Sequence, residues 1–135
     1  MNFTDKYIKM CDCEEVQGHR SKRMNEYKLL LSGDHYIDSM NSNECYVYSL
    51  EENNAPGNFS FYITWLPLQH DTQSLIFQYG SCQYKLLSDF YDWCTDKREK
   101  TIGALKGKSM EEMWLMFYMW RDHYKIWDGE KWIKE

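Results

Sequence analysis

The sequence predicts an α+β fold, in which a small antiparallel β-meander of three or four strands packs against about four helices, with a buried helix near the C-terminus. Three observations predict this class. Residues 109–124 read SMEEMWLMFYMWRDHY and are apolar or aromatic without a break from Met113 to Trp120, so a helix there must be covered on most sides. Short runs between residues 27 and 65 are rich in β-branched and aromatic residues, which favours strands. Two stretches between residues 67 and 95 repeat apolar residues at helical spacing.

Composition indicates a single domain spanning residues 1–135. A chain of 135 residues with 17% aromatics is long enough to bury a core. Its net charge of −5 is unfavourable for a general nucleic-acid binder, because phosphate contacts need a basic surface. The five cysteines are odd in number and irregularly spaced, unlike a secreted disulfide framework. No signal-peptide pattern opens the chain and no apolar run is long enough to span a bilayer, so we expect a cytoplasmic protein without a membrane segment.

The first half of the chain is predicted to hold one helix and then the sheet. Thr4 is a plausible N-cap, apolar residues recur on neighbouring turns up to Val16, and Gly18 is a fitting stop. The predicted strands follow at residues 27–31, 35–38, 45–50 and 58–65. The clearest loop is Asn-Asn-Ala-Pro-Gly-Asn at residues 53–58.

The second half is predicted to be helical until its last turn. Pro67 suits the first turn of a helix, whose apolar stripe is Leu68, Thr72, Leu75, Ile76 and Tyr79 and which Gly80 would end. A second stripe predicts a helix over residues 82–95, formed by Leu86 or Leu87, Phe90, Trp93 and Cys94. Ser109 can cap the buried helix, with Glu112 three residues on completing a capping box. Asp128-Gly129 then predicts a turn that brings Trp127 and Trp132 back onto the protein.

No sequence motif predicts a catalytic residue, a cofactor or a metal site. Residues 103–109, GALKGKS, approach a phosphate-binding loop but have three residues where the pattern needs four, and no buried strand precedes them. Cys11 and Cys13 lie two apart, so on a helix their thiols diverge, and zinc would need further ligands at recognisable spacing. The histidines His35, His70 and His123 are each isolated in sequence, although any of them could meet a carboxylate in the fold.

The aromatic content is larger than a core of this size obviously needs. Six tryptophans and eleven tyrosines suggest that some lie on a binding or oligomer surface, where Trp and Tyr are enriched. Six residues are the candidates for ligand or partner binding: Tyr46, Tyr48, Tyr62, Trp65, Trp127 and Trp132. The alternative is that Trp93, Trp114 and Trp120 form the core and that Trp127 and Trp132 are packing lids.

Three stretches together resemble a family of small, uncharacterised proteins encoded by phages and prophages. They are WLPLQ at residues 65–69 ahead of an amphipathic helix, SMEEMWLMF at 109–117 and KIWDGEKW at 125–132, and residues 5–17 are similar to the first helix of the same family. Residues 26–58 are not covered. The resemblance implies expression inside an infected bacterium but no catalytic residue.

These observations predict a non-catalytic phage accessory protein in the host cytoplasm that binds a host protein or a small ligand, with counter-defence as one purpose. A homo-oligomer is compatible with the aromatic surplus, whereas nucleic acid and membrane are not expected partners. The alternative is a small nuclease or nucleotide hydrolase, whose His and carboxylate site would be assembled only by the fold.

Overall fold

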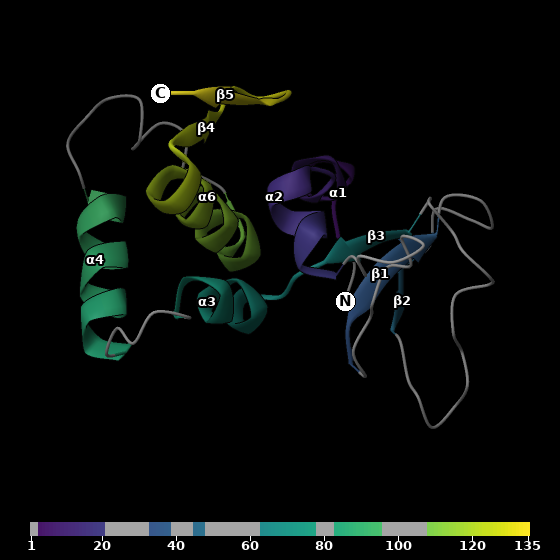
Figure 1. The fold of residues 1–135 in the computed structure, drawn as a ribbon, viewed down its shortest axis with the longest axis horizontal. Coiled ribbons are helices and arrows are strands. Elements are labelled where there is room, and N and C mark those ends of the chain that lie inside the picture. The colour runs from purple at the N-terminus through teal and green to yellow at the C-terminus, as the bar shows by residue number, and fades with distance from the viewer. Residues whose placement is uncertain (1–2, 21–32, 39–44, 48–62, 78–82, 96–107) are drawn as a thin grey trace. The chain divides into compact units, whose positions relative to one another are not determined.

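The computed structural model describes residues 3–20, 33–38, 45–47, 63–77, 83–95 and 108–135 (Figure 1). The chain divides into two compact units. The N-terminal unit comprises Met1–Pro67 and Gly129–Lys131, and the C-terminal unit comprises Leu68–Asp128 and Trp132–Glu135. Helices and antiparallel sheets occur together, so the predicted α+β class is confirmed. The single domain over residues 1–135 stays a prediction.

The N-terminal unit begins with two short helices where one was predicted over residues 4–16. Helix α1 spans Asp5–Cys11 and is capped by the Thr4 hydroxyl, which accepts a hydrogen bond from the Tyr7 amide at 3.1 Å. The backbone leaves the helical region at Asp12 and Cys13, and α2 (Glu14–Gln17) and the 3₁₀ turn η1 (Gly18–Arg20) follow. Gly18, the predicted stop, is the C-cap residue of α2 and has a right-handed φ of −57°.

The break has a packing reason. Cys11 and Val16 are both completely buried. In an unbroken helix, two residues five positions apart would point in directions that differ by about 140°. Restarting the helix after Cys13 lets both side chains enter the core, and the Cys13 carbonyl accepts the Gln17 amide at 2.8 Å to begin the new turn.

The sheet of this unit has three antiparallel strands in the order β2-β1-β3. Strand β1 (His35–Asp38) is central, between β2 (Cys45–Val47) and β3 (Ile63–Leu66). A meander would place consecutive strands side by side, whereas here β3 pairs with β1 and not with β2. Helices α1 and α2 pack against β3. The predicted strand at residues 27–31 lies outside the described residues.

The C-terminal unit is built around α6 (Met110–His123), with α3 (Gln69–Phe77) and α4 (Gln83–Thr95) packed against it (Figure 1). The predicted stripes are largely confirmed: Thr72, Leu75 and Ile76 of α3 are buried, as are Leu86, Phe90 and Trp93 of α4. Leu86 rather than Leu87 belongs to the α4 stripe, because Leu87 is exposed. Tyr79 and Gly80 lie outside the described residues.

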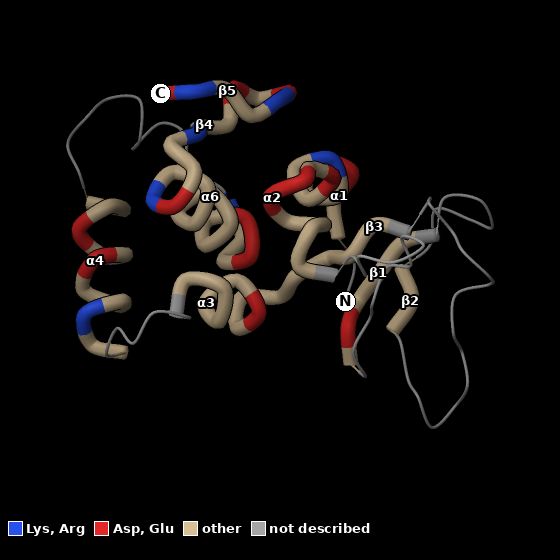
Figure 2. Tube along the Cα trace, in the orientation of Figure 1, with Lys and Arg blue, Asp and Glu red and all other residues tan. Residues whose placement is uncertain are grey.

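Helix α6 is buried over most of its length, as predicted. The Ser109 hydroxyl caps it by accepting a hydrogen bond from the Glu112 amide at 3.1 Å. Every residue from Trp114 to Met119 is buried, and Figure 2 shows that charged residues occur only towards the two ends of the helix. Within the described residues, no helix has the length and apolar character needed to cross a membrane.

The predicted turn after α6 is also confirmed. Strands β4 (Lys125–Trp127) and β5 (Trp132–Lys134) form an antiparallel hairpin, and Gly129 takes the left-handed φ of 109° that its turn requires. Trp127 and Trp132 are cross-strand neighbours with ring centroids 5.1 Å apart. Strand β4 packs against α6.

Replacing Tyr124 with glycine is expected to stabilise the protein. Tyr124 ends α6 in the left-handed region at φ 56°, where a Cβ is unfavourable and glycine is the usual residue. We expect Tyr124→Gly to raise the free energy of unfolding by about 0.5–1 kcal/mol in urea titration. Tyr91 is a matched control because it is also an exposed tyrosine but lies inside α4, so Tyr91→Gly should lower the free energy of unfolding by about 0.5 kcal/mol. Equal losses in both variants would contradict this account of the helix end.

Candidate functional site

The structure describes four of the six aromatic residues that the sequence nominates for binding. Trp65 is 0% exposed, so it has no surface to offer a partner and belongs to the core of the N-terminal unit. Tyr46 is half-buried on β2 and stacks on Tyr36 with ring centroids 5.6 Å apart. Trp127 is buried and Trp132 half-buried in the hairpin, which suits the alternative that they are packing lids. Tyr48 and Tyr62 lie outside the described residues.

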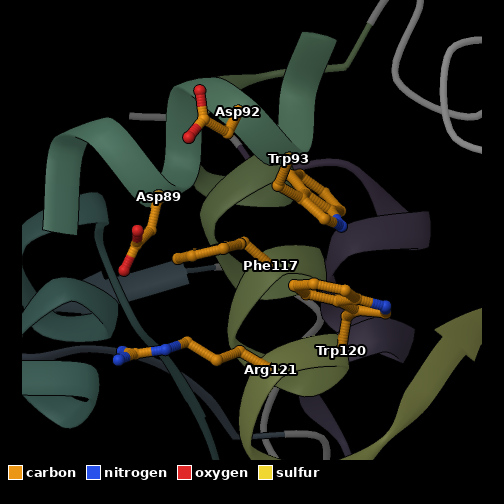
Figure 3. A pocket seen from close by; sticks show the side chains of 6 residues that line it. All are labelled: Asp89, Asp92, Trp93, Phe117, Trp120 and Arg121. Carbon is orange, nitrogen blue, oxygen red and sulfur yellow. The ribbon is translucent and has the colours of Figure 1, made fainter. Parts of the chain in front are cut away.

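A different set of side chains forms an open pocket of about 390 Å³ in the C-terminal unit. We call it the aromatic groove and define it by its six lining residues, shown in Figure 3: Asp89, Asp92 and Trp93 from α4, and Phe117, Trp120 and Arg121 from α6.

Helix geometry explains why these six residues meet. Each helix contributes residues at positions i, i+3 and i+4, which lie on one face of a helix. The buried stripe of α4 seats that helix against α6, and this contact brings the two triplets to the same groove. Two segments separated by more than twenty positions in sequence thereby supply one site.

The aromatic side chains are graded in exposure from the floor to the rim. Phe117 is 1% exposed and forms the floor, Trp93 is 8% exposed, and Trp120 is half-buried and so presents the most accessible ring. The centroid of Trp120 is 6.3 Å from that of Trp93 and 6.2 Å from that of Phe117. Behind them Phe90 stacks on Trp114 at 3.8 Å. Because the inner rings are packed on both sides, the groove has a stiff aromatic wall.

The charges of the groove are only partly compensated within the protein. The Asp89 carboxylate lies 3.5 Å from the Lys85 ammonium group, one turn away on α4. Neither Asp92 nor Arg121 has an ion-pair partner within 4.0 Å among the residues that the structure describes. In Figure 3 they lie on opposite sides of the groove, with Phe117 between them. The groove therefore carries one anion and one cation that have no ion-pair partner within 4.0 Å in the described part of the chain, beside an accessible indole.

Two titratable groups next to the groove are shifted. Burial raises the pKa of the Cys94 thiol above its ordinary value, which disfavours the reactive thiolate at neutral pH. Partial burial also raises the pKa of the Asp122 carboxyl, while the neighbouring Arg121 and His123 act in the opposite direction. Neither group is among the described residues that line the groove, and none of those residues is a serine, cysteine or histidine.

The three histidines have separate surroundings. His35 on β1 meets Phe3 edge-on at 5.8 Å. His70 is exposed on α3, with Asp71, its neighbour in sequence, 3.3 Å away. His123 lies 3.0 Å from the Tyr118 hydroxyl. Within the described ranges, no group of three His, Cys, Asp or Glu side chains is arranged to hold a metal ion.

The sequence alone offers core positions for Trp93 and Trp120 as one of two alternatives and does not predict the groove. The signal was present in the two triplets with matching i, i+3 and i+4 spacing, each joining an aromatic residue to a charged one. Only the packing of α4 on α6 reveals that the triplets face each other. Comparison of the chain with known protein families, characterised proteins and solved structures found no match.

Proposed function

We propose that this is a non-catalytic accessory protein of a phage or prophage, and that it binds a host protein through the aromatic groove. The observation that carries the proposal is a groove that combines an accessible Trp120 ring with Asp92 and Arg121, neither of which has an ion-pair partner in the described part of the chain. Tryptophan and arginine are the residues most enriched among the energetic centres of protein interfaces.

A partner protein suits this groove better than a substrate does. Among the described residues, the lining side chains provide stacking surfaces and charges, and none of them carries a hydroxyl, thiol or imidazole group. A charged pair at the rim of an apolar centre is the arrangement that selects a complementary protein surface and fixes its register. Asp92 and Arg121 would each gain a partner on binding, whereas a purely apolar ligand would leave both charges without one.

The phage context supports the biological purpose. The segments at residues 65–69, 109–117 and 125–132 resemble small phage and prophage proteins, and such a protein would act in the cytoplasm of the infected bacterium. Counter-defence is the purpose that we assign to it: the protein would occupy the surface of a host immune protein and so block it.

The proposal is tested by capture and direct titration. The tagged full-length protein is used to capture partners from lysate of a bacterial host, and each purified partner is then titrated against wild-type protein and against Trp120→Leu. We expect Trp120→Leu to weaken binding by about tenfold or more, because removing a central tryptophan typically costs about 2 kcal/mol or more of binding free energy.

Two controls accompany the titration. Tyr84 is an exposed aromatic residue of α4 outside the groove, so Tyr84→Ser should leave the affinity within about twofold. Urea titration of each variant checks that the fold is retained. If binding survives Trp120→Leu but not Tyr84→Ser, the groove is not the interface. If native mass spectrometry finds a retained metabolite and no protein partner, the ligand is a small molecule instead.

A further inference from the structure

We infer that one exposed face of α4 binds the same face of a second copy of this chain, with the two helices antiparallel. The face consists of Tyr84, Leu87, Tyr91 and Cys94, and we call it the α4 seam. The inference does not depend on the aromatic groove or on the proposed host partner. It follows from the exposure and spacing of the seam residues, from their sizes and from the charges of α4.

The α4 seam is a row of exposed apolar side chains. Six large apolar side chains are exposed in the described part of the chain, and three of them lie on this one helix. Tyr84 is 85% exposed, Tyr91 66% and Leu87 53%, and Cys94 at the end of the row is half-buried. Single exposed apolar residues are ordinary, whereas contiguous ones mark a surface that another molecule covers.

The spacing of the seam is that of a helix that packs on another helix. Its residues occupy positions i, i+3, i+7 and i+10, which is the alternating three- and four-residue repeat of a coiled-coil contact. The buried residues of α4 are Leu86, Phe90 and Trp93, and they contact the aromatic rings of α6. On a helical projection the centre of the seam lies about 110° away from these buried residues. The seam therefore faces away from the contact between α4 and α6.

A second copy fits the seam by size when the two helices are antiparallel. In that order Tyr91 of each copy meets the smaller Leu87 of the other, and Tyr84 meets Cys94. Each layer then pairs a ring with a smaller side chain, so the two rows interdigitate. In a parallel pair each residue would face its own copy, and tyrosine would meet tyrosine. The antiparallel contact uses the same surface in both copies, so it closes at a dimer.

The charges of α4 favour the same order. Lys85 lies in the first turn of the helix and Asp92 in the last (Figure 2), which is the reverse of what the helix dipole favours. An antiparallel copy places the cationic end of each helix beside the anionic end of the other. The positions that flank the seam are uncharged: Gln83, Ser88, Phe90 and Thr95. A second copy therefore meets no like charge beside the seam, where charges would set the choice of partner.

The accessible area of the seam indicates a weak, reversible dimer. Because a whole aromatic side chain offers about 150–250 Å², the two tyrosines leave about 200–400 Å² accessible in each copy. A second copy supplies the same area again, and the total stays below the limit of about 1,200 Å² that is typical of transient contacts. We therefore expect the dimer to form at about 0.1–1 mM protein and to dissociate on dilution.

Sedimentation velocity of the full-length protein over about 0.01–1 mM tests this dimer. We expect Leu87→Glu and Tyr91→Glu each to raise the Kd of the dimer by about tenfold or more, because each brings a charge into an apolar layer twice per dimer. Met110→Glu is the matched control, since Met110 is an exposed apolar residue of α6, and it should leave the Kd within about twofold. Circular dichroism of each variant checks that the fold is retained.

Disulfide trapping tests the antiparallel order. Tyr84→Cys places a thiol opposite Cys94 of the second copy, so mild oxidation of the concentrated protein should link these two positions between copies. Peptide mass mapping identifies the link, and the same variant carrying Cys94→Ser should lose it. A wild-type dimer linked through Cys94 of both copies would show that the helices are parallel and would overturn the order proposed here.

The remaining outcomes decide whether the seam is a self-contact. A protein that stays monomeric at about 1 mM, or a dimer that Leu87→Glu and Tyr91→Glu leave intact, would overturn the inference. If the purified chain is monomeric and a host protein loses binding in Leu87→Glu, the seam binds that protein instead of a second copy. The proposed function is tested separately, because Trp120 lies in the aromatic groove and is not a seam residue.

Discussion

Replacing Phe117 with alanine is expected to lower the free energy of unfolding by about 3–5 kcal/mol, the usual cost of removing a buried phenylalanine. Phe117 is 1% exposed and lies at the centre of an aromatic cluster. Its ring centroid is 5.5 Å from those of Phe90 and Trp93, 5.8 Å from that of Trp114 and 6.2 Å from that of Trp120. The alanine variant would lose all four ring contacts and leave a cavity between α4 and α6.

Urea titration followed by tryptophan fluorescence and by circular dichroism measures this loss. Leu87→Ala is the control, because Leu87 is a large apolar residue of α4 that is exposed, and changes at such sites are usually within about 0.5 kcal/mol. Phe117→Leu should recover a substantial part of the lost stability, since it refills much of the cavity. A loss below about 1 kcal/mol in Phe117→Ala would mean that the ring is not enclosed by the cluster.

Features that depend on local chemistry could be predicted from the sequence. The caps at Thr4 and Ser109 follow from a hydroxyl placed before a helical stripe. The hairpin of β4 and β5 follows from Asp128-Gly129 between two tryptophans. The burial of α6 follows from a segment with no polar face. In each case the deciding residues lie within a few positions of one another.

Features that depend on distant contacts could not be predicted. The helix break at Asp12 and Cys13 contains no glycine or proline that would predict it. The break is required instead by the burial of side chains on both sides of it. The strand order β2-β1-β3 depends on the pairing of β3 with β1, which lie far apart in sequence. The aromatic groove exists only because α4 packs on α6, so neither triplet identifies it alone. Trp65 is a binding candidate from the sequence but is buried in the structure. Its burial depends on neighbours far along the chain, so no residue close to Trp65 in sequence indicates it.

Gln17 makes contacts with residues far from it in sequence. Replacing Gln17 with alanine is expected to lower the free energy of unfolding by about 3 kcal/mol. Gln17 is 6% exposed, and its side-chain amide pairs with the peptide of Trp65 on the edge strand β3. Its Nε2 donates to the Trp65 carbonyl at 2.9 Å and to the Cys11 carbonyl at 2.9 Å, while its Oε1 accepts from the Trp65 amide at 2.8 Å. Alanine would leave these buried backbone groups without the bonds that Gln17 supplies, and each such group costs about 1–3 kcal/mol, less where water enters.

The isosteric change Gln17→Glu separates hydrogen bonding from packing and predicts the sign of a pH effect. A carboxylate keeps the acceptor for the Trp65 amide but faces the Cys11 and Trp65 carbonyls, to which Nε2 donated. Burial and these two carbonyls therefore favour the protonated form, which raises the pKa of the introduced carboxyl above its ordinary value. The contribution of the introduced carboxyl to the free energy of unfolding is fully present below the ordinary glutamate pKa of about 4.3. This contribution is lost as the pH rises through the raised pKa of the carboxyl in the folded protein. In urea titrations, the free energy of unfolding of Gln17→Glu should therefore fall short of the wild-type value by less at a pH of about 5 than at a pH of about 8. The corresponding deficit of Gln17→Ala should be the same at both pH values. A constant deficit in Gln17→Glu would mean that this side chain is hydrated rather than enclosed between α1, α2 and β3.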